Sequence, residues 1–239
     1  MSTFLQLAVK TRKNVRGTGS GPTSVSNQSG EYGRIVDWVA DAYKEIQQRH
    51  SNWRWLRSRF NFNTVASTDT YAYTAVTDSR LSATITRFLR WITVDNDGLP
   101  NVTAYLTSGG VSGENHLIFL PWSIFRSIYK FGAQSALTGQ PVHYTVDPQN
   151  KLVLGPNPSG IYTIQGEYQM SPQILAADAD EPEMPAEFHD VIMYRAMEKL
   201  AIDGAAVERL DRAIIEGGRM MRSLERSQLD GVRLGRPMA

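Results

Sequence analysis

The residue types that most often carry chemistry are few in this chain, and they stand far apart. The histidines are His50, His116, His143 and His189, and no two of them lie within four residues of each other. A metal site built on one helix or strand needs such a local pair. His189 has carboxylates beside it, but in the first turn of a helix that pattern is typical of a solvated surface. We therefore predict no metal site and no cofactor.

Three short motifs resemble known sites but lack an essential part. Residues 95–98 (DNDG) resemble the start of a calcium loop, yet Leu106 stands where the closing glutamate is needed. A plain hairpin turn is the favoured interpretation. The glycine-rich residues 109–113 and 17–21 have no following Lys-Ser/Thr, and neither joins a strand to a helix as a phosphate loop or a nucleophile elbow requires. We predict no catalytic residue, and hence no enzyme.

Tryptophans interleaved with arginines form the most suggestive cluster. Aromatic rings next to arginines stack on bases or sugars. Two binding functions are thus open: a carbohydrate-acting or carbohydrate-binding protein, and a single-strand nucleic-acid binder. In the competing and favoured interpretation the rings belong to the core, as large aromatics at a junction between helices and strands usually do. The cluster comprises Trp53, Arg54, Trp55, Arg57 and Arg59.

The composition narrows the class of protein. The 239 residues, 41% hydrophobic and 10% aromatic, are enough for a globular chain with its own core. The net charge of +1 argues against a dedicated nucleic-acid binder. No apolar stretch approaches the roughly 20 residues of a membrane helix, and the order of apolar and basic residues at the N-terminus is wrong for a signal peptide. The absence of cysteine fits synthesis in a reducing cytosol.

Two helices are predicted near the N-terminus, with a polar strap between them. Residues 2–15 place their apolar side chains on one face and basic residues near the end. Residues 17–30 (GTGSGPTSVSNQSG) are too polar to fold alone. We expect them to be a flexible strap that lets the first helix pack away from the next one. Ser29 is a candidate N-cap for the second helix, which ends near His50.

From residue 60 the hydrophobic period changes from three and four to two. Strand candidates separated by Asp-Gly, Gly-Gly and Pro-rich turns continue to residue 170, interrupted by one helix at residues 121–131. Such short spacing favours an antiparallel meander or small barrel. The strand candidates after residue 73 are 86–94, 101–106, 116–120, 142–146, 151–154 and 161–170.

Helices return after an acidic link at residues 178–185. One is predicted over residues 186–202 and a second over 205–228, and Gly217 permits close approach of the two backbones. Residues 230–239 show no periodicity and read as an extended tail. The seam of the last helix is expected to hold Val207, Leu210, Ile214, Gly217, Met221 and Leu224.

These elements together predict an α+β fold. A helical bundle formed by the N- and C-terminal helices carries a β-rich antiparallel insertion, and both termini are extended. The expected divisions are 1–59 with the strap at 17–30, then 60–176 for the insertion, 177–229 for the C-terminal helices and 230–239 for the tail.

The order of the helical segments resembles the head-to-tail adaptor proteins of tailed bacteriophages, also called connector or neck proteins. The resemblance rests on the strap running into residues 32–39 (YGRIVDWV), on residues 42–47 (AYKEIQ) followed by 53–56 (WRWL), and on residues 185–192 (PAEFHDVI) opening the penultimate helix. It covers the two helical ends of the chain.

The resemblance implies a structural virion protein without catalysis. It implies a homo-oligomeric ring, a dodecamer, that docks below the portal protein of the filled capsid and holds a downstream tail or neck protein. Packaged double-stranded DNA passes through the channel without sequence-specific binding, and no membrane is involved. The protein is made in the host cytoplasm and ends in the virion neck. The candidate partner-binding residues are Lys10, Arg12, Lys13, Arg233, Leu234, Arg236 and Met238.

Overall fold

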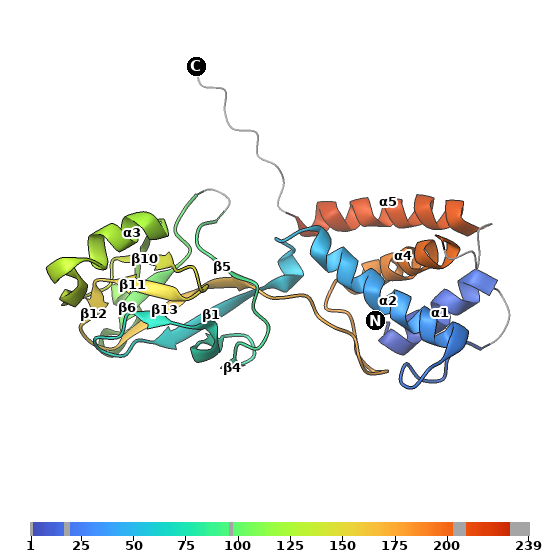
Figure 1. Ribbon diagram of the computed structural model, residues 1–239, viewed down its shortest axis with the longest axis horizontal. Coiled ribbons are helices and arrows are strands. Elements are labelled where there is room, and N and C mark those ends of the chain that lie inside the picture. The colour runs from blue at the N-terminus through green and yellow to red at the C-terminus, as the bar shows by residue number, and fades with distance from the viewer. Residues whose placement is uncertain (1, 17–19, 96–97, 203–208, 230–239) are drawn as a thin grey trace, which may run out of the picture. The chain divides into compact units, whose positions relative to one another are not determined.

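The computed structural model describes residues 2–16, 20–95, 98–202 and 209–229 of the chain. Within these residues it is a mixed α and β protein with five α-helices and mainly antiparallel strand pairs, as the sequence predicts. The chain divides into two compact units (Figure 1). Residues 1–56 and 172–239 form the helical unit, and residues 57–171 form the β-rich unit.

The described part of the helical unit contains α1 (Phe4–Arg16), α2 (Gly30–Arg49), α4 (His189–Ile202) and α5 (Leu210–Gln228), with the short 3-10 helices η1 (Arg54–Leu56) and η6 (Ala186–Phe188). α4 packs against each of the other three α-helices. Figure 1 shows α5 running alongside α4. Helices from both ends of the sequence therefore share one core.

The apolar stripe of α2 is buried, as its spacing predicts. Ile35, Val39 and Tyr43 are at most 1% exposed. The helix follows Ser29, whose backbone is extended as at an N-cap although its side chain makes no capping hydrogen bond, and it ends before His50. Both ends of α2 lie where the sequence places them.

α1 packs against α2 and α4, so the expectation that it lies away from the next helix is wrong. Phe4 and Leu7 are buried. The backbone N–H groups of Phe4 and Leu5 donate to the carbonyl oxygens of Asp180, at 2.8 Å, and Asp178, at 3.3 Å. These bonds satisfy donors that a helix N-terminus leaves unpaired. Burial of its apolar face stabilises α1 in this position.

The described part of the strap is held by the acidic link. Val25 is buried, and its backbone N–H donates to Oδ1 of Asp178 at 2.5 Å. The hydroxyl of Ser24 donates to the same oxygen at 3.1 Å. Ser24 and Val25 of this polar segment are thus held by a carboxylate of the same chain.

The contact between α4 and α5 depends on a glycine. A Cβ atom at Gly217 would lie 2.9 Å from Cβ of Tyr194 on α4, which is closer than such atoms approach. Gly217, Met221 and Leu224 are buried, as predicted. Ile214, however, is 51% exposed, and Ala213 takes the buried position, so that part of the predicted seam is wrong. Because a helix has 3.6 residues per turn, residue 213 or residue 214 can complete the face that packs on α4.

The β-rich unit has one long strand at each end of its sequence and short strands between them. These are β1 (Arg57–Asn63), β2 (Thr70–Tyr71), β3 (Thr77–Asp78), β4 (Ala83–Thr84), β5 (Arg90–Ile92), β6 (Thr103–Leu106), β7 (Asn115–His116), β8 (Ile118–Phe119), β9 (Thr138–Gly139), β10 (His143–Val146), β11 (Leu152–Gly155), β12 (Asn157–Pro158) and β13 (Tyr162–Gln169), with one α-helix, α3 (Trp122–Tyr129).

The strands form three sheets rather than a meander or a single small barrel. In the seven-stranded sheet the order is β4-β3-β1-β13-β6-β7, and β5 also pairs with β13. The second sheet has the order β2-β11-β10-β8, and β9 pairs with β12. Only the pairs β8–β10 and β9–β12 are parallel among the described strands. Because β13 lies between β1 and β6, the first and last strands of the unit are at the centre of its sheet.

Register brings a glycine opposite a core aromatic at this centre. Phe60 on β1 faces Gly166 on β13. A Cβ at Gly166 would lie 2.8 Å from the Phe60 ring, which is itself buried and stacks edge-on against Trp91 at 4.8 Å. The missing side chain makes room for the ring.

A buried carboxylate ties β3 to β1 and β13. One oxygen of Asp78 accepts hydrogen bonds from the hydroxyls of Tyr168, at 2.5 Å, and Ser58, at 3.0 Å. The other accepts from the backbone N–H groups of Arg80 and Leu81. Burial opposes the charge, but the hydrogen bonds from Tyr168, Leu81, Arg80 and Ser58 outweigh it and lower the pKa of Asp78.

Candidate functional site

The histidines His189 and His143 form hydrogen bonds within the fold. His189 is 2% exposed, not solvated as expected. Its Nδ1 accepts from the N–H of Ser2 at 3.2 Å, so its Nε2 carries the proton that is donated to the carbonyl oxygen of Met184 at 3.1 Å. The imidazole ties the N-terminus to the start of α4. His143 pairs with the hydroxyl of Tyr129.

Among the described residues, no group of three or more His, Asp or Glu side chains is placed to hold a metal ion. At the proposed turn, Oδ1 of Asp95 accepts from the N–H of Leu99 at 2.9 Å, and Gly98 has a positive φ of 78°. Asp97 lies outside the described residues. The geometry of the described part is that of a turn.

Trp53 belongs to the core of the helical unit. Its ring is fully buried, and Nε1 donates to the carbonyl oxygens of Ile46, at 3.0 Å, and Gln47, at 3.1 Å. Trp55 is half-buried and stacks on Trp53 with 4.2 Å between ring centres. A platform for sugars or bases that uses both rings is therefore excluded, because Trp53 cannot reach a ligand.

The basic residues of α1 differ in how much they present to a partner. Lys10 forms an ion pair with Asp190, and the Arg12 side chain is 11% exposed beside Glu31, at 3.8 Å. Lys13 is exposed. Of this group, Lys13 has the most open side chain for docking. The other candidates, Arg233, Leu234, Arg236 and Met238, lie outside the described residues.

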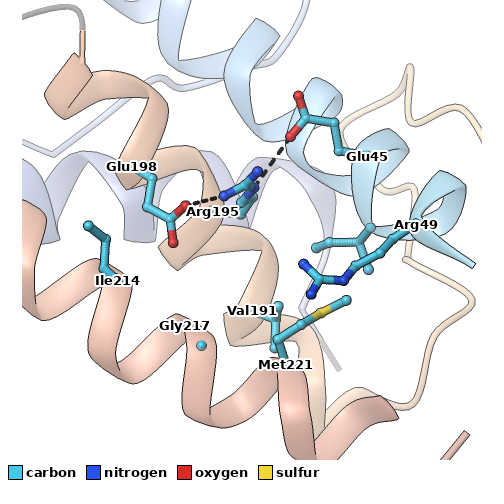
Figure 2. A pocket seen from close by; sticks show the side chains of 10 residues that line it. Glu45, Arg49, Val191, Arg195, Glu198, Ile214, Gly217 and Met221 are labelled. Carbon is cyan, nitrogen blue, oxygen red and sulfur yellow. Dashed lines mark hydrogen bonds and ion pairs between the residues drawn. The ribbon is translucent and has the colours of Figure 1, made fainter.

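A hollow of about 380 Å³ opens between α2, α4 and α5 (Figure 2). Ile46, Val191, Ile214 and Met221 give it apolar walls, and Gly217 leaves part of it open. Charged side chains stand at its margin. Figure 2 shows Arg195 between Glu198, to which Nη1 donates, and Glu45, whose carboxylate lies 3.4 Å from Nε.

Further ion pairs connect α2 with α4 and α5. Lys199 also pairs with Glu45. At the end of α2, Arg49 lies 2.9 Å from Glu225 of α5, and His50 lies 3.0 Å from the same carboxylate. The positive and negative side chains balance one another. The hollow therefore has apolar walls, and the charged groups around it carry no net charge together. Such a surface suits an apolar side chain of a partner.

The sequence carries one further signal on α5. Arg212, Arg219, Arg222 and Arg226 recur at steps of seven, three and four, which places them on one face of α5. All four are exposed. The predicted seam put Ile214 in the core, and this error concealed the apolar wall of the hollow.

None of the described helices is long and apolar enough to span a membrane. A search of curated proteins finds no match to the chain. A family model described as SU10 adaptor protein matches residues 2–236, across both units. This match confirms the family predicted from the helical ends and extends it to the β-rich unit. The chain therefore belongs to the SU10 adaptor protein family, a family of phage head-to-tail adaptors.

Proposed function

We propose that this protein is a structural subunit of the virion neck, where copies of it form a ring below the portal and link the DNA-filled capsid to the tail. The observation that carries the proposal is the family match over residues 2–236. The surface supports it as well, because a hollow of the helical unit offers apolar contact beside compensated charges.

The two units have different parts in this proposal. The four long helices act as the bundle that holds the ring, and the β-rich unit faces outward or toward the next tail or neck component. Twelve copies form the ring. Double-stranded DNA passes through without sequence-specific contacts, which a net charge of +1 favours because fewer phosphate contacts mean weaker retention.

Docking to the portal is assigned to the C-terminal tail, residues 230–239. Its Arg233 and Arg236 supply charge, and Leu234 and Met238 supply apolar contact. Lys13 on α1 is a second contact. α1 is not part of the portal-reaching segment, since its apolar face is buried in the helical unit.

Truncation at Leu229 tests this function. The full chain is expected to co-sediment with the purified portal, and the chain ending at residue 229 is expected to remain unbound while its circular dichroism and melting temperature stay unchanged. Equal co-sedimentation of both chains would remove the tail from the docking site. Failure of the full chain to bind any portal would contradict the proposed function itself.

A further inference from the structure

The outward face of α5 carries a row of arginines with apolar residues among them. Arg219 has a side chain 72% exposed, and Arg212, Arg222 and Arg226 are exposed on the same side. Ile215, 66% exposed, continues the row at steps of three and four from its neighbours. This face is turned away from the buried Ala213, Met221 and Leu224, which pack toward α4.

A different side of α5 lines the hollow of Figure 2. Ile214 is half exposed and lines it, and Gly217 and Gly218 leave its floor without side chains. An exposed apolar patch rimmed by arginine has the composition of a protein interface. Duplex DNA is a poorer fit, because phosphates that lie against the isoleucines would lose water without gaining hydrogen bonds.

The link before α4 has the opposite charge and its own exposed isoleucine. Residues 172–187 (PQILAADADEPEMPAE) hold five acidic residues and no lysine or arginine. Ile174 is 80% exposed, whereas its neighbour Leu175 is 5% exposed and anchors the segment. Glu181 and Glu187 are exposed.

Hydrogen bonds hold this link in one shape. Gln173 donates its N–H to Oε1 of Gln47 at 2.7 Å and accepts from Nε2 of Gln47 at 2.9 Å. Its side-chain amide donates to the carbonyl oxygen of Glu181 at 3.0 Å, which holds Glu181 near Gln173. Oδ2 of Asp180 accepts from two backbone N–H groups, and these bonds lower the pKa of that carboxyl. Ile174 is therefore presented by a pre-organised loop, which reduces the entropy lost on binding.

The hollow and Gln173 of the link lie against different faces of α2. Glu45 lines the hollow and Gln47 holds the link. Two residues along a helix are separated by about 200° around its axis. One copy can therefore offer its link to one neighbour and its hollow to another.

We propose that the α5 face of one copy binds the link of a second copy, with Ile174 in the hollow and Glu181 and Glu187 against the arginine row. This inference rests on the proposed ring and names its subunit contact. The contact is heterologous, because it joins two different surfaces, and repeated contacts of this kind close into a ring when the rotation permits.

Reciprocal charge reversal tests the contact. One variant carries Arg219→Glu and Arg222→Glu, and the other carries Glu181→Arg and Glu187→Arg. All four positions are exposed, so both variants are expected to fold. Lys151→Glu, an exposed change in the β-rich unit, is the control. Mass photometry and sedimentation measure self-association at high protein concentration and the number of copies bound per portal.

Each reversed variant is expected to lose self-association at least tenfold, and a 1:1 mixture is expected to restore it, because the two variants then alternate with opposite charges in every contact. The control is expected to assemble as the wild type does. Assembly of either single variant like the wild type, or a mixture no better than its components, would overturn the inference.

Other outcomes separate this inference from the proposed function. A wild-type chain that associates with itself through these residues but never binds a portal would contradict the function and leave the contact standing. A wild-type chain that binds the portal in full number while the reversed variants do the same would overturn the contact and leave the function standing. Unchanged assembly with lost binding of duplex DNA would assign the α5 face to nucleic acid and overturn the contact.

Discussion

Asp78 shows how a single side chain can hold three strands of the β-rich unit together. Four donors surround its carboxylate, two of them hydroxyls from β1 and β13 and two of them backbone N–H groups of the following turn. A buried charge needs such partners. Removing either the donors or the carboxylate leaves unpaired polar groups inside the fold.

Replacing Asp78 by asparagine is expected to destabilise the β-rich unit by about 2 kcal/mol, since an amide NH₂ would face donor hydroxyls. Urea unfolding followed by tryptophan fluorescence measures the change, with the exposed Asp37→Asn as control. A loss below about 0.5 kcal/mol, the usual range for a surface change, would contradict the role of this carboxylate.

Asp78 also predicts a direction of acid sensitivity. Because the folded-state pKa is lowered, ionised Asp78 contributes stability that is fully present above the unfolded pKa of about 3.9 and is lost as pH falls through the lower folded value. The wild-type unfolding free energy is expected to fall more steeply than that of Asp78→Asn below about pH 4. Parallel pH profiles of the unfolding free energy for the two proteins would show that Asp78 is not the source of the acid sensitivity.

Among the elements, the contact between α4 and α5 depends most clearly on one residue type. A methyl group at Gly217 meets the backbone-proximal Cβ of Tyr194 at 2.9 Å, whereas one at Gly218 meets the far end of the Arg222 side chain at 3.6 Å. The two adjacent glycines thus form a matched pair.

Gly217→Ala is expected to destabilise the helical unit by about 1–3 kcal/mol, because the helices must separate. Gly218→Ala is expected to stabilise it by roughly 0.5–1 kcal/mol through helix propensity. Thermal unfolding followed by circular dichroism compares them. Equal effects of the two changes would contradict the close approach at Gly217.

The elements that the sequence predicts well are those with a strong local period. α2 runs from Gly30 to Arg49, as its stripe and cap indicate, and α3 lies within the predicted 121–131. Contacts between distant segments were not predictable in this way. The position of β13 between β1 and β6 and the docking of α1 on α4 depend on long-range burial that no local pattern encodes.

The candidate site was predicted less well for a related reason. Its residues come from three helices, and no local pattern in the sequence shows that they lie together. Ile214 looked like core because it is apolar at a seam position, and His189 looked like surface because carboxylates flank it. Only the packing of the helical unit distinguishes the exposed isoleucine from the buried imidazole.

At the scale of the whole molecule, a net charge of +1 conceals a separation of charge. The arginines of α5 and the carboxylates of residues 172–187 lie in one unit, each beside an exposed isoleucine. A chain with two complementary faces is suited to assembly with copies of itself. These properties agree with an adaptor.

Mass measurement of the purified protein, with and without its portal, tests the central claim most directly. The proposed function predicts a monomer or weakly associating species by itself and a closed ring of defined number, twelve copies, on the portal. A protein whose mass is the same with and without the portal would contradict the account of this chain as the ring that joins head to tail.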